Sequence, residues 1–509
     1  MVKKMKKTLM MFIFALMASA ASAYDAKIDG ICYNLVLKSN MAEVVAGDDK
    51  YSGQVVIPSM VEYEGTTYNV SSIAERAFGS CSELTSVVLP KGIKEIKPET
   101  FMECTSLESV SLPDDLQILG DRAFYFCFSL KECQLPESVD SVGSYVFQEC
   151  QSLTTVNIPE KLKAVPDGMF FSCRSLASVA IPETVLTIGR SSFSGCSSLE
   201  SVSIPVGVTS IGESAFSGCK AITEMLLPET LDSIAANAFF GCEGLVTVEI
   251  PKGVTGKIDC FGGCTHLESV TIPEGVSLLG GFSGCSSLTS IEIPVGVTVI
   301  LENAFKDCTR LTSIVLPDDV QTIGTEAFFG CKNLGTITFG SGLIRIHDFA
   351  FEDCDGLTVV VLPDGIEDIG ELAFADCSAL KSITIGKGIN CIRRFAFRDC
   401  RALEDFYCYA ETPPGSMPEG EEMTIFDNSY INFATLHVPE SAIETYRTTA
   451  PWSEFGQIVA IEGTGIRGVN ASGSSADSPY YNLSGQKVKT SYKGIVIQNG
   501  KKRIVGGPL

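Results

Sequence analysis

The sequence has little of the side-chain chemistry on which most active sites depend. Among its 509 residues there are three His and one Trp. His266, His347 and His437 lie in separate regions, and there is no Ser–His–Asp arrangement, phosphate-binding glycine loop or carboxylate pair at a fixed catalytic spacing. We therefore predict no catalytic residue, no metal site and no cofactor, and we disfavour a hydrolase.

Basic residues are also scarce. Lys and Arg number 38 against 61 Asp and Glu, which gives a formal net charge of -23. This charge disfavours DNA, RNA and anionic membranes as partners, because all of them are polyanions. The hydrophobic content of 45% and the mean hydropathy of +0.23 exclude a disordered chain, since disordered chains lack the apolar side chains for a core.

Long apolar runs are confined to the N-terminus. MVKKMKK is basic, TLMMFIFALMA is apolar but too short to span a bilayer comfortably, and Ala21-Ser22-Ala23 has the small–x–small form of a signal-peptidase site. No later run reaches 18 apolar residues, so we predict no membrane span. We interpret residues 1–23 as a cleaved signal peptide and expect a secreted or cell-surface protein. A stage or residence in the periplasm is left open.

Cysteine, by contrast, is abundant and recurs at one spacing. Each of fifteen cysteines has a Phe three residues before it and Leu, or once Ile222, three residues after it, and apolar residues follow at six, eight, twelve and fifteen. The step is 23 residues, except for one step of 22 and one of 21, and the cysteines are 81, 104, 127, 150, 173, 196, 219, 242, 264, 285, 308, 331, 354, 377 and 400. Such a period predicts one stack of repeats rather than separate globular domains.

The copy from Cys196 to Cys219 shows the expected geometry. In SLESVSIP, Val202 and Ile204 alternate with polar residues, which predicts a short strand with both side chains inward. VTSIG predicts a second short strand, and ESAFSGC a single helical turn. The pattern L-x-x-V-x-I followed by a turn is the leucine-rich-repeat form. We predict a mainly β, right-handed leucine-rich-repeat solenoid with a parallel strand ladder, about 15 repeats long, with a cap at each end.

The repeated cysteine is best interpreted as a packing residue, because it is small, apolar enough to bury and a weak donor to nearby backbone. Metal or redox chemistry is the alternative, but the spacing does not resemble C-x-x-C metal pairs. In-register side chains point the same way, which keeps neighbouring Cβ atoms too far apart for a disulfide, so we expect mostly free thiols. Outside this series, Cys391 is the candidate for a reactive thiol; an unreactive exposed cysteine is the alternative.

The motif AF-x-x-C-x-x-L-x-x-V-x-L/I-P-x-x-V-x-x-I-G resembles the BspA-like leucine-rich repeats over roughly residues 54–408. Proteins with these repeats occur on the surface of anaerobic bacteria and some parasitic protists. The resemblance implies an adhesin that binds extracellular-matrix proteins or other cells, and it carries no catalytic motif.

The segments that flank the repeats predict caps. Residues 24–76 read as a β-rich N-terminal cap with a degenerate first repeat, because VVIP and VSSIAERAF copy parts of the motif found in residues 77–408. Residues 409–463 are the predicted C-terminal cap, which begins with an acidic, Pro-rich loop. A linker at residues 464–478 and a small basic tail at residues 479–509 follow. The alternating pattern of the tail predicts a small β-unit. It resembles the sorting domains of type IX secretion, and docking on the acidic body is the alternative role.

Two features of the C-terminal cap lead to specific predictions. Ser441 and Glu444 form a capping box, which predicts a short helix through Tyr446. Trp452, the one tryptophan, is expected to cover the last coil, and a functional aromatic platform is the alternative.

The outward positions of the predicted strands provide the candidate binding site. The residue five places after the cysteine is Ser or Thr in eleven of the fifteen coils. We expect a hydroxyl-lined face that binds an extracellular protein or glycan, with the candidate residues Ser178, Ser201, Thr247, Ser269, Ser290 and Ser313. Ser and Thr are also common solvent-facing strand residues, so a passive structural or spacer protein is the second hypothesis. A thiol-dependent enzyme is the third.

The two shortened repeats predict a local irregularity. The missing residues fall after the first strand, Lys257 replaces the usual Ile, and Gly280-Gly281 replaces the segment before the Phe. We expect apolar contact to be lost from the back of the stack near residues 252–284, giving a bend or weakened region there with the first strand ladder intact. A hinge is one interpretation, and a harmless deletion is the other.

Overall fold

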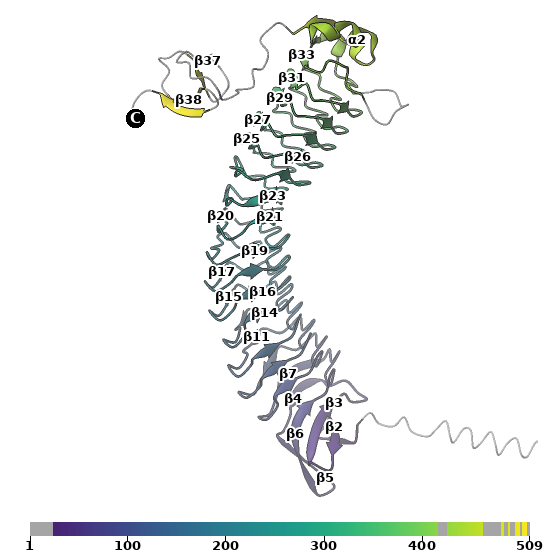
Figure 1. The fold of residues 1–509 in the computed structure, drawn as a ribbon. Helices are drawn as coiled ribbons and strands as arrows, with labels where there is room; N and C mark the ends of the chain where they lie inside the picture. Colours follow the sequence, from purple (N-terminus) through teal and green to yellow (C-terminus); the bar gives the residue numbers. More distant parts are fainter. Residues whose placement is uncertain are drawn as a thin grey trace, which may run out of the picture.

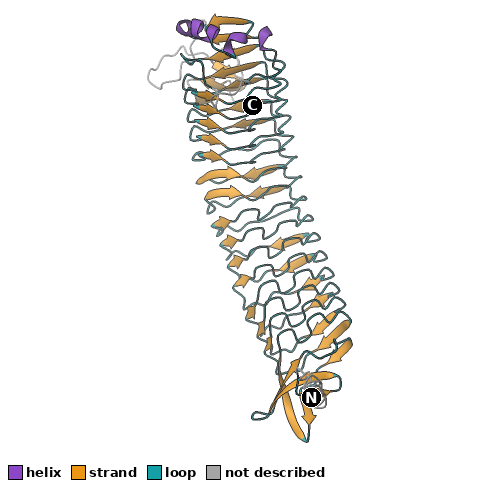
Figure 2. Cartoon of the chain, turned by 90° about the vertical axis from the view of Figure 1, so that its right-hand side faces the viewer, coloured by secondary structure: helices purple, strands orange, loops and turns teal. Residues whose placement is uncertain are grey.

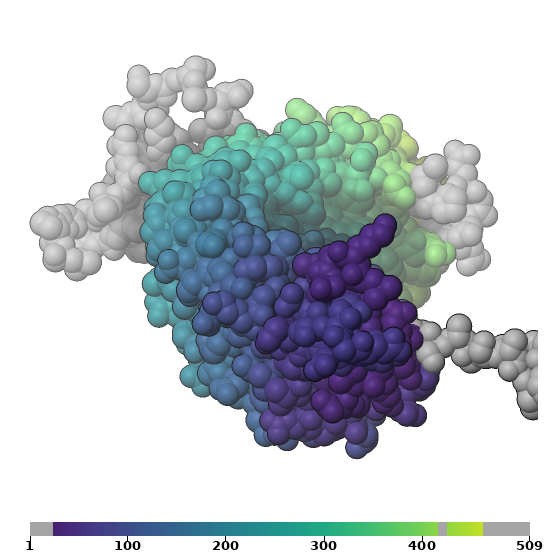
Figure 3. Space-filling model, turned by 90° about the horizontal axis from the view of Figure 1, so that it is seen from below, coloured from purple at the N-terminus to yellow at the C-terminus, as the bar shows by residue number. Residues whose placement is uncertain are grey.

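The computed structural model describes residues 24–415 and 425–461, together with the backbone of four short strands in the C-terminal tail. Residues 24–461 form a rod of stacked coils between a β-sheet and a cap that contains a short helix (Figure 1). The rod is bowed, with the coils around β17 and β20 at the apex of the curve. Viewed from its lower end, the chain sweeps around from the N-terminal cap to the C-terminal coils (Figure 3).

The first strand of each coil lies where the alternation of apolar residues predicts it. In β17, Val202 is buried between exposed Ser201 and Ser203, and it lies in register opposite Val179 of β15. We call this series the first ladder, and all its pairs are parallel. Its strands within the repeats are β4 Gly53–Val56, β7 Leu84–Val88, β9 Ser109–Ser111, β11 Glu132–Cys133, β13 Thr155–Val156, β15 Ser178–Ala180, β17 Ser201–Ser203, β20 Thr247–Glu249, β22 Ser269–Thr271, β25 Ser313–Val315, β27 Thr336–Thr338, β29 Val359–Val361, β31 Ser382–Ile385 and β33 Asp405–Cys408.

A second ladder runs along another side of the rod, as VTSIG and its equivalents predict (Figure 2). Most of its strands bury one apolar residue, such as Ile211 in β18. The strands are β8 Glu95–Ile96, β10 Ile118–Leu119, β12 Ser141–Val142, β14 Ala164–Val165, β16 Thr187–Ile188, β18 Ser210–Ile211, β19 Ser233–Ile234, β21 Gly256–Asp259, β23 Val276–Gly280, β24 Val299–Ile300, β26 Thr322–Ile323, β28 Arg345–Ile346, β30 Asp368–Ile369 and β32 Cys391–Ile392. The prediction of a mainly β solenoid with parallel ladders is confirmed; the handedness of the coil stays a prediction.

The segment before each cysteine corrects the prediction of a helical turn. It consists of tight turns in which two residues take left-handed backbone angles, such as Ser214 (φ 55°) and Gly218 (φ 73°). These angles point alternate N–H groups along the rod, so that Ser214, Phe216 and Gly218 donate to carbonyls of the next coil at 2.7–3.1 Å. We call this the turn side of the rod.

Phenylalanine forms the continuous core of the stack. The fifteen Phe side chains from 78 to 397 are fully buried, and each ring stacks on the next with centroids 5.0–5.9 Å apart. Tyr51 continues this column at the N-terminal end, and Phe426 continues it at the C-terminal end. A coil alone would leave both faces of its Phe in water, so the coils stabilise one another.

The two short repeats differ from the prediction. Strands β21 and β23 are the longest of the second ladder, and they open a seven-stranded sheet that runs on to β32. A register shift at Gly256/Lys257 puts Ile258 into the core opposite Leu279, and both are fully buried. The prediction of lost apolar contact is therefore wrong. The first ladder is interrupted nearby, where residues 288–294 form no strand, and it is interrupted in the same way at residues 222–228, where only an isolated bridge joins Glu224 to Thr247.

The N-terminal cap is a five-stranded sheet in the order β1-β2-β3-β6-β5. Strands β5 and β6 form an antiparallel hairpin whose turn is Glu64-Gly65. Strand β4 pairs in parallel with β7, which confirms a degenerate first coil. The cap strands are β1 Ala26–Ile28, β2 Ile31–Val36, β3 Met41–Val45, β5 Met60–Tyr63 and β6 Thr66–Ile73.

The C-terminal cap adds two strands and short helices. Trp452 is fully buried against Phe406 and Phe426, which confirms that it covers the last coil and rules out an exposed aromatic platform. A short helix forms as predicted, but the capping box is wrong, because the Ser441 hydroxyl donates to Glu411 instead of capping the helix. The elements are η1 Ile431–Phe433, β34 Thr435–Val438, η2 Glu440–Ala442, α2 Ile443–Thr448, η3 Trp452–Glu454 and β35 Gln457–Ala460.

The tail contains four short strands where we predicted a small β-unit. They form an antiparallel sheet in the order β37-β36-β38-β39. The strands are β36 Tyr480–Asn482, β37 Lys487–Val488, β38 Gly494–Gln498 and β39 Lys501–Val505. The predicted signal peptide, the whole of the predicted linker and part of the acidic Pro-rich loop lie outside the described residues. Among the residues that are described, no helix has the length and apolar character needed to cross a membrane.

Candidate functional site

The candidate site is the exposed surface of the first ladder, which we call the strand face. All six residues predicted to bind a ligand are exposed there. Ser178 and Ser201 are direct neighbours in register, as are Thr247 and Ser269. Ser313 lies on β25, whereas Ser290 lies in the stretch without a strand. The structure therefore places the six on one face but does not join them into a single continuous row.

The hydroxyl row is interrupted by other chemistry. Glu132, Glu224, Val359 and Asp405 occupy the same repeat position as the serines and threonines. Two places further along the strand, Val315 and Val361 also point outward. Val315, Val359 and Val361 are 61%, 51% and 48% exposed. The C-terminal half of the strand face thus carries an apolar group that our emphasis on hydroxyls did not identify.

The N-terminal end of the strand face is hollowed. A groove of about 550 Å³ crosses β7, β9 and β11. Ser86, Ser109 and Ser111 line it with side chains too short to fill the space, and the longer Glu132 and Gln134 stand beside them. The groove lies outside the six residues that we predicted. A signal was present in the sequence, because Ser109 and Ser111 occupy both outward positions of one strand.

An aromatic pair lies at the C-terminal end of the strand face. The rings of Tyr407 on β33 and His437 on β34 stack with centroids 4.1 Å apart, and His437 Nε2 lies 2.8 Å from a carboxylate oxygen of Asp405. Sequence reasoning did not connect these two residues and treated His437 only as one of three histidines in separate regions. The period fails between them, because 30 residues separate these neighbours instead of 23.

The repeated cysteines face the interior of the turn side, not the strand face. From Cys104 to Cys400, each Sγ of the series donates to the carbonyl of the Phe in the preceding coil, at 3.1–3.3 Å. That carbonyl also accepts the N–H of the cysteine in its own coil, as Phe193 does from Cys196 at 3.1 Å. None of the fifteen is in a disulfide. The predictions of packing and of free thiols are therefore confirmed for this series.

The environment of fourteen of these thiols opposes thiol chemistry, whereas a side-chain hydrogen bond with Cys104 lowers the pKa of Cys81, at the N-terminal end of the series, to about 7. Burial raises the pKa of Cys196 to about 12, and it likewise raises the pKa of Cys219 and Cys354. Because the thiolate is the reactive form, these groups are inert at neutral pH. Cys391 is half-buried on β32, and its reactivity stays a prediction. Within residues 24–415 and 425–461, no group of three His, Cys, Asp or Glu side chains could hold a metal ion.

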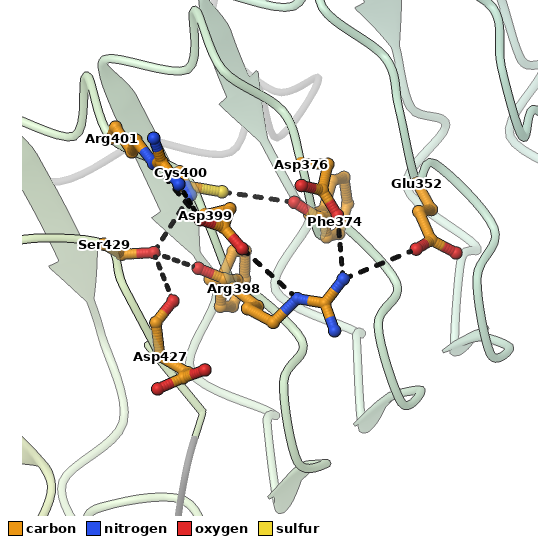
Figure 4. Close-up of polar contacts among 10 residues, drawn as sticks. Glu352, Phe374, Asp376, Arg398, Asp399, Cys400, Arg401, Asp427 and Ser429 are labelled. Carbon is orange, nitrogen blue, oxygen red and sulfur yellow. Dashed lines mark hydrogen bonds and ion pairs between the residues drawn. The ribbon is translucent and has the colours of Figure 1, made fainter.

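At the last coil, polar side chains replace the contacts that the next repeat would make (Figure 4). The Ser429 hydroxyl, buried in the C-terminal cap, donates to the Phe397 carbonyl where the next cysteine would stand, and it accepts the Cys400 N–H at 3.0 Å. Nearby, Arg398 lies 3.0 Å from Asp376 and also pairs with Glu352 and Asp399. Arg398 neutralises acids from three successive coils, so this network stabilises the end of the stack.

Comparison with known proteins identifies the repeats. Residues 71–200, 186–312 and 298–412 match the profile of the BspA type leucine rich repeat region. A leucine-rich repeat protein from Bacteroides ovatus is 26% identical, with a TM-score of 0.52, over 75% of this chain and 94% of its own. A leucine rich cell surface protein from Faecalibacterium prausnitzii is 29% identical over 77% of this chain and 95% of its own, with a TM-score of 0.44. No curated protein matches. The chain belongs to the family of BspA-type leucine-rich repeat proteins.

Proposed function

We propose that this chain is an exported surface protein that binds an extracellular protein through the strand face, in the manner of an adhesin. The observation that carries the proposal is the exposure of three valines on the strand face, Val359 and Val361 on β29 and Val315 two strands away on β25. These valines stand on a flat, regular ladder among hydroxyl groups, and their exposure costs free energy until a partner covers them.

Two further observations support export and binding. The predicted signal peptide at residues 1–23 directs a chain out of the cytoplasm, and the similar Faecalibacterium prausnitzii protein is a cell surface protein. Repeat solenoids commonly use their extended surfaces for protein recognition. A passive spacer is the competing function, and it gives no reason for exposed valines on the strand face.

The test is binding of the purified chain to immobilised fibronectin, laminin, fibrinogen and collagen, and to a glycan array. We expect saturable binding to at least one protein, weakened at least tenfold in V315S/V359S/V361S. The control is V206S/V295S, which replaces valines that are at least as exposed but lie in the turns after the first-ladder segments. Absence of binding to every protein would favour the spacer. Binding that both variants lower equally would exclude the strand face as the site.

A further inference from the structure

We infer that the N-terminal groove of the strand face binds an extended peptide segment carrying Arg or Lys side chains. This inference rests on the proposed protein-binding function and adds a second, chemically distinct site to it. The groove, of about 550 Å³, is lined by Gln54 and by residues of β7, β9 and β11 and the turns that follow them.

Strand register explains the shape of the groove. Gln54, Ser86, Ser109 and Glu132 are successive partners across β4, β7, β9 and β11. The two serines in the middle of this row have short side chains, and the residues at its two ends, Gln54 and Glu132, have long ones. The serines therefore form a floor between two longer side chains. Adjacent strands lie about 4.8 Å apart, which places the two walls roughly 14 Å apart at the backbone. A trough of this width accommodates one extended peptide with its side chains.

The charge of the groove selects a cationic ligand. Glu132 and Asp114 both line it, and no Lys or Arg does. Their neighbours in sequence and space are neutralised: Asp115 pairs with Lys94 at 2.7 Å.

Glu108 is paired in the same way, with Lys131 at 2.8 Å. Within the described ranges, by contrast, no hydrogen bond or ion pair to the carboxylates of Asp114 and Glu132 is found. Of these four acids, the two without a side-chain partner in the described ranges are the two that line the groove. Arginine is well suited to them, because its guanidinium binds carboxylates through paired N–H groups.

The polar groups of the floor favour a peptide over a sugar. Ser86, Ser109 and Ser111 can donate to and accept from peptide groups, and Gln134 adds an amide at the wall. No aromatic residue lines the groove, so a sugar ring would find no flat apolar face on which to stack. A glycan ligand is accordingly the alternative outcome of the test.

The probe is a library of fluorescent decapeptides with Arg at one or two fixed positions, and the same library with citrulline, which is uncharged and close to Arg in shape. Fluorescence polarisation with the full chain is measured at 50 and 200 mM salt. We expect Arg peptides to bind at least tenfold more tightly than citrulline peptides, with affinity falling at the higher salt. Equal affinity for the two libraries, including no binding of either, would overturn the inference.

Two pairs of variants locate the site. S109L/S111L fills the trough, and its control S201L/S203L makes the same change at the equivalent positions of β17, outside the groove. D114N/E132Q removes the charge without changing the shape, and its control is E249Q on β20. We expect each groove variant to bind Arg peptides at least tenfold more weakly than wild type. Each control variant should bind them as tightly as wild type. Equal loss in groove and control variants would contradict the inference.

The outcome is separable from that of the proposed function. If V315S/V359S/V361S abolishes matrix-protein binding while the groove variants bind Arg peptides no differently from wild type, the proposed function stands and the groove inference falls. If Arg peptides bind the groove but no extracellular protein binds the chain, the groove inference stands and the proposed function falls. Glycan-array binding that is lost in S109L/S111L would make the groove a sugar site and would also overturn the inference.

Discussion

The turn side and the strand face of the same coils differ in how regularly they repeat along the rod. On the turn side, every coil repeats the same buried Phe and the same cysteine, with nearly constant distances from one coil to the next. On the strand face, outward positions hold Ser in one coil, Glu in another and Val in a third. The comparison teaches that the turn side and the inward strand residues specify the fold, and that the outward residues of the strand face can vary without disturbing it.

The largest effect that would test this division is loss of one ring from the Phe column. Phe239 is fully buried, whereas its neighbour Phe240 is 50% exposed. We expect F239A to lower the free energy of unfolding by about 3–5 kcal/mol, because it leaves a cavity between Phe216 and Phe261. F240A should change it by less than about 0.5 kcal/mol. Chemical denaturation measures both, and similar losses would show that the column is not the main source of stability.

A second effect concerns the buried thiols and pH. The pKa of Cys196 is raised from 9.0 to about 12 in the folded chain, so the unfolded chain loses its proton first. The buried Cys196 thiol therefore makes its full contribution to the free energy of unfolding below pH 9, and this contribution is lost as pH rises from 9 toward 12. At pH 10 the loss is about 1.4 kcal/mol relative to pH 7. C196A should remove this part of the pH dependence, whereas S201A should retain it; unchanged dependence in C196A would contradict the assignment.

Hydrogen exchange compares the two ladders where the repeats are short. Amides of β21 and β23 should exchange as slowly as those of β16 and β18, because Ile258 and Leu279 close the core there. Amides in residues 288–294, which form no strand, should exchange at least tenfold faster. Faster exchange in β21 and β23 than in β16 and β18 would instead support the prediction of a weakened region near residues 252–284.

The smallest expected effect is on the strand face itself. S201A should change the free energy of unfolding by less than about 0.5 kcal/mol, since its hydroxyl is exposed. V202A, one residue along, should cost about 2 kcal/mol because Val202 is buried in the ladder. Thermal denaturation of the two variants at one concentration is sufficient. A destabilising S201A would show that the hydroxyl row has a structural role.

The sequence predicted the parts of this structure that depend on the period. A fixed spacing of Phe, Cys and Leu defines which residues stack, so the core, both ladders and the packing role of cysteine followed directly. The left-handed residues on the turn side were missed, because Ser, Asn, Arg and Glu occupy many of these positions as well as Gly.

Features that depend on neighbouring coils were harder to predict. The groove arises because short side chains in β7 and β9 lie beside a long one in β11, and no single repeat contains that information. Tyr407 and His437 meet only because the inserted segment after Cys408 returns the chain to the first ladder. The shortened repeats misled us since the register shifted and restored the core.

The turn side gives the rod a direction, with an N–H end and a carbonyl end. Alternate N–H groups of this side face the C-terminal end, where the cap supplies acceptors: the Phe397 N–H donates to the Ile425 carbonyl and the Asp399 N–H to the Asp427 carbonyl. At the opposite end the Lys50 ammonium donates to the outward Gly79 carbonyl. Head-to-tail joining of two rods would bring complementary rows together, and an uncapped stack would be a template for open-ended filaments. The caps therefore end the stack at both sides. A repeat that could otherwise be added without limit thus forms a rod of one defined length.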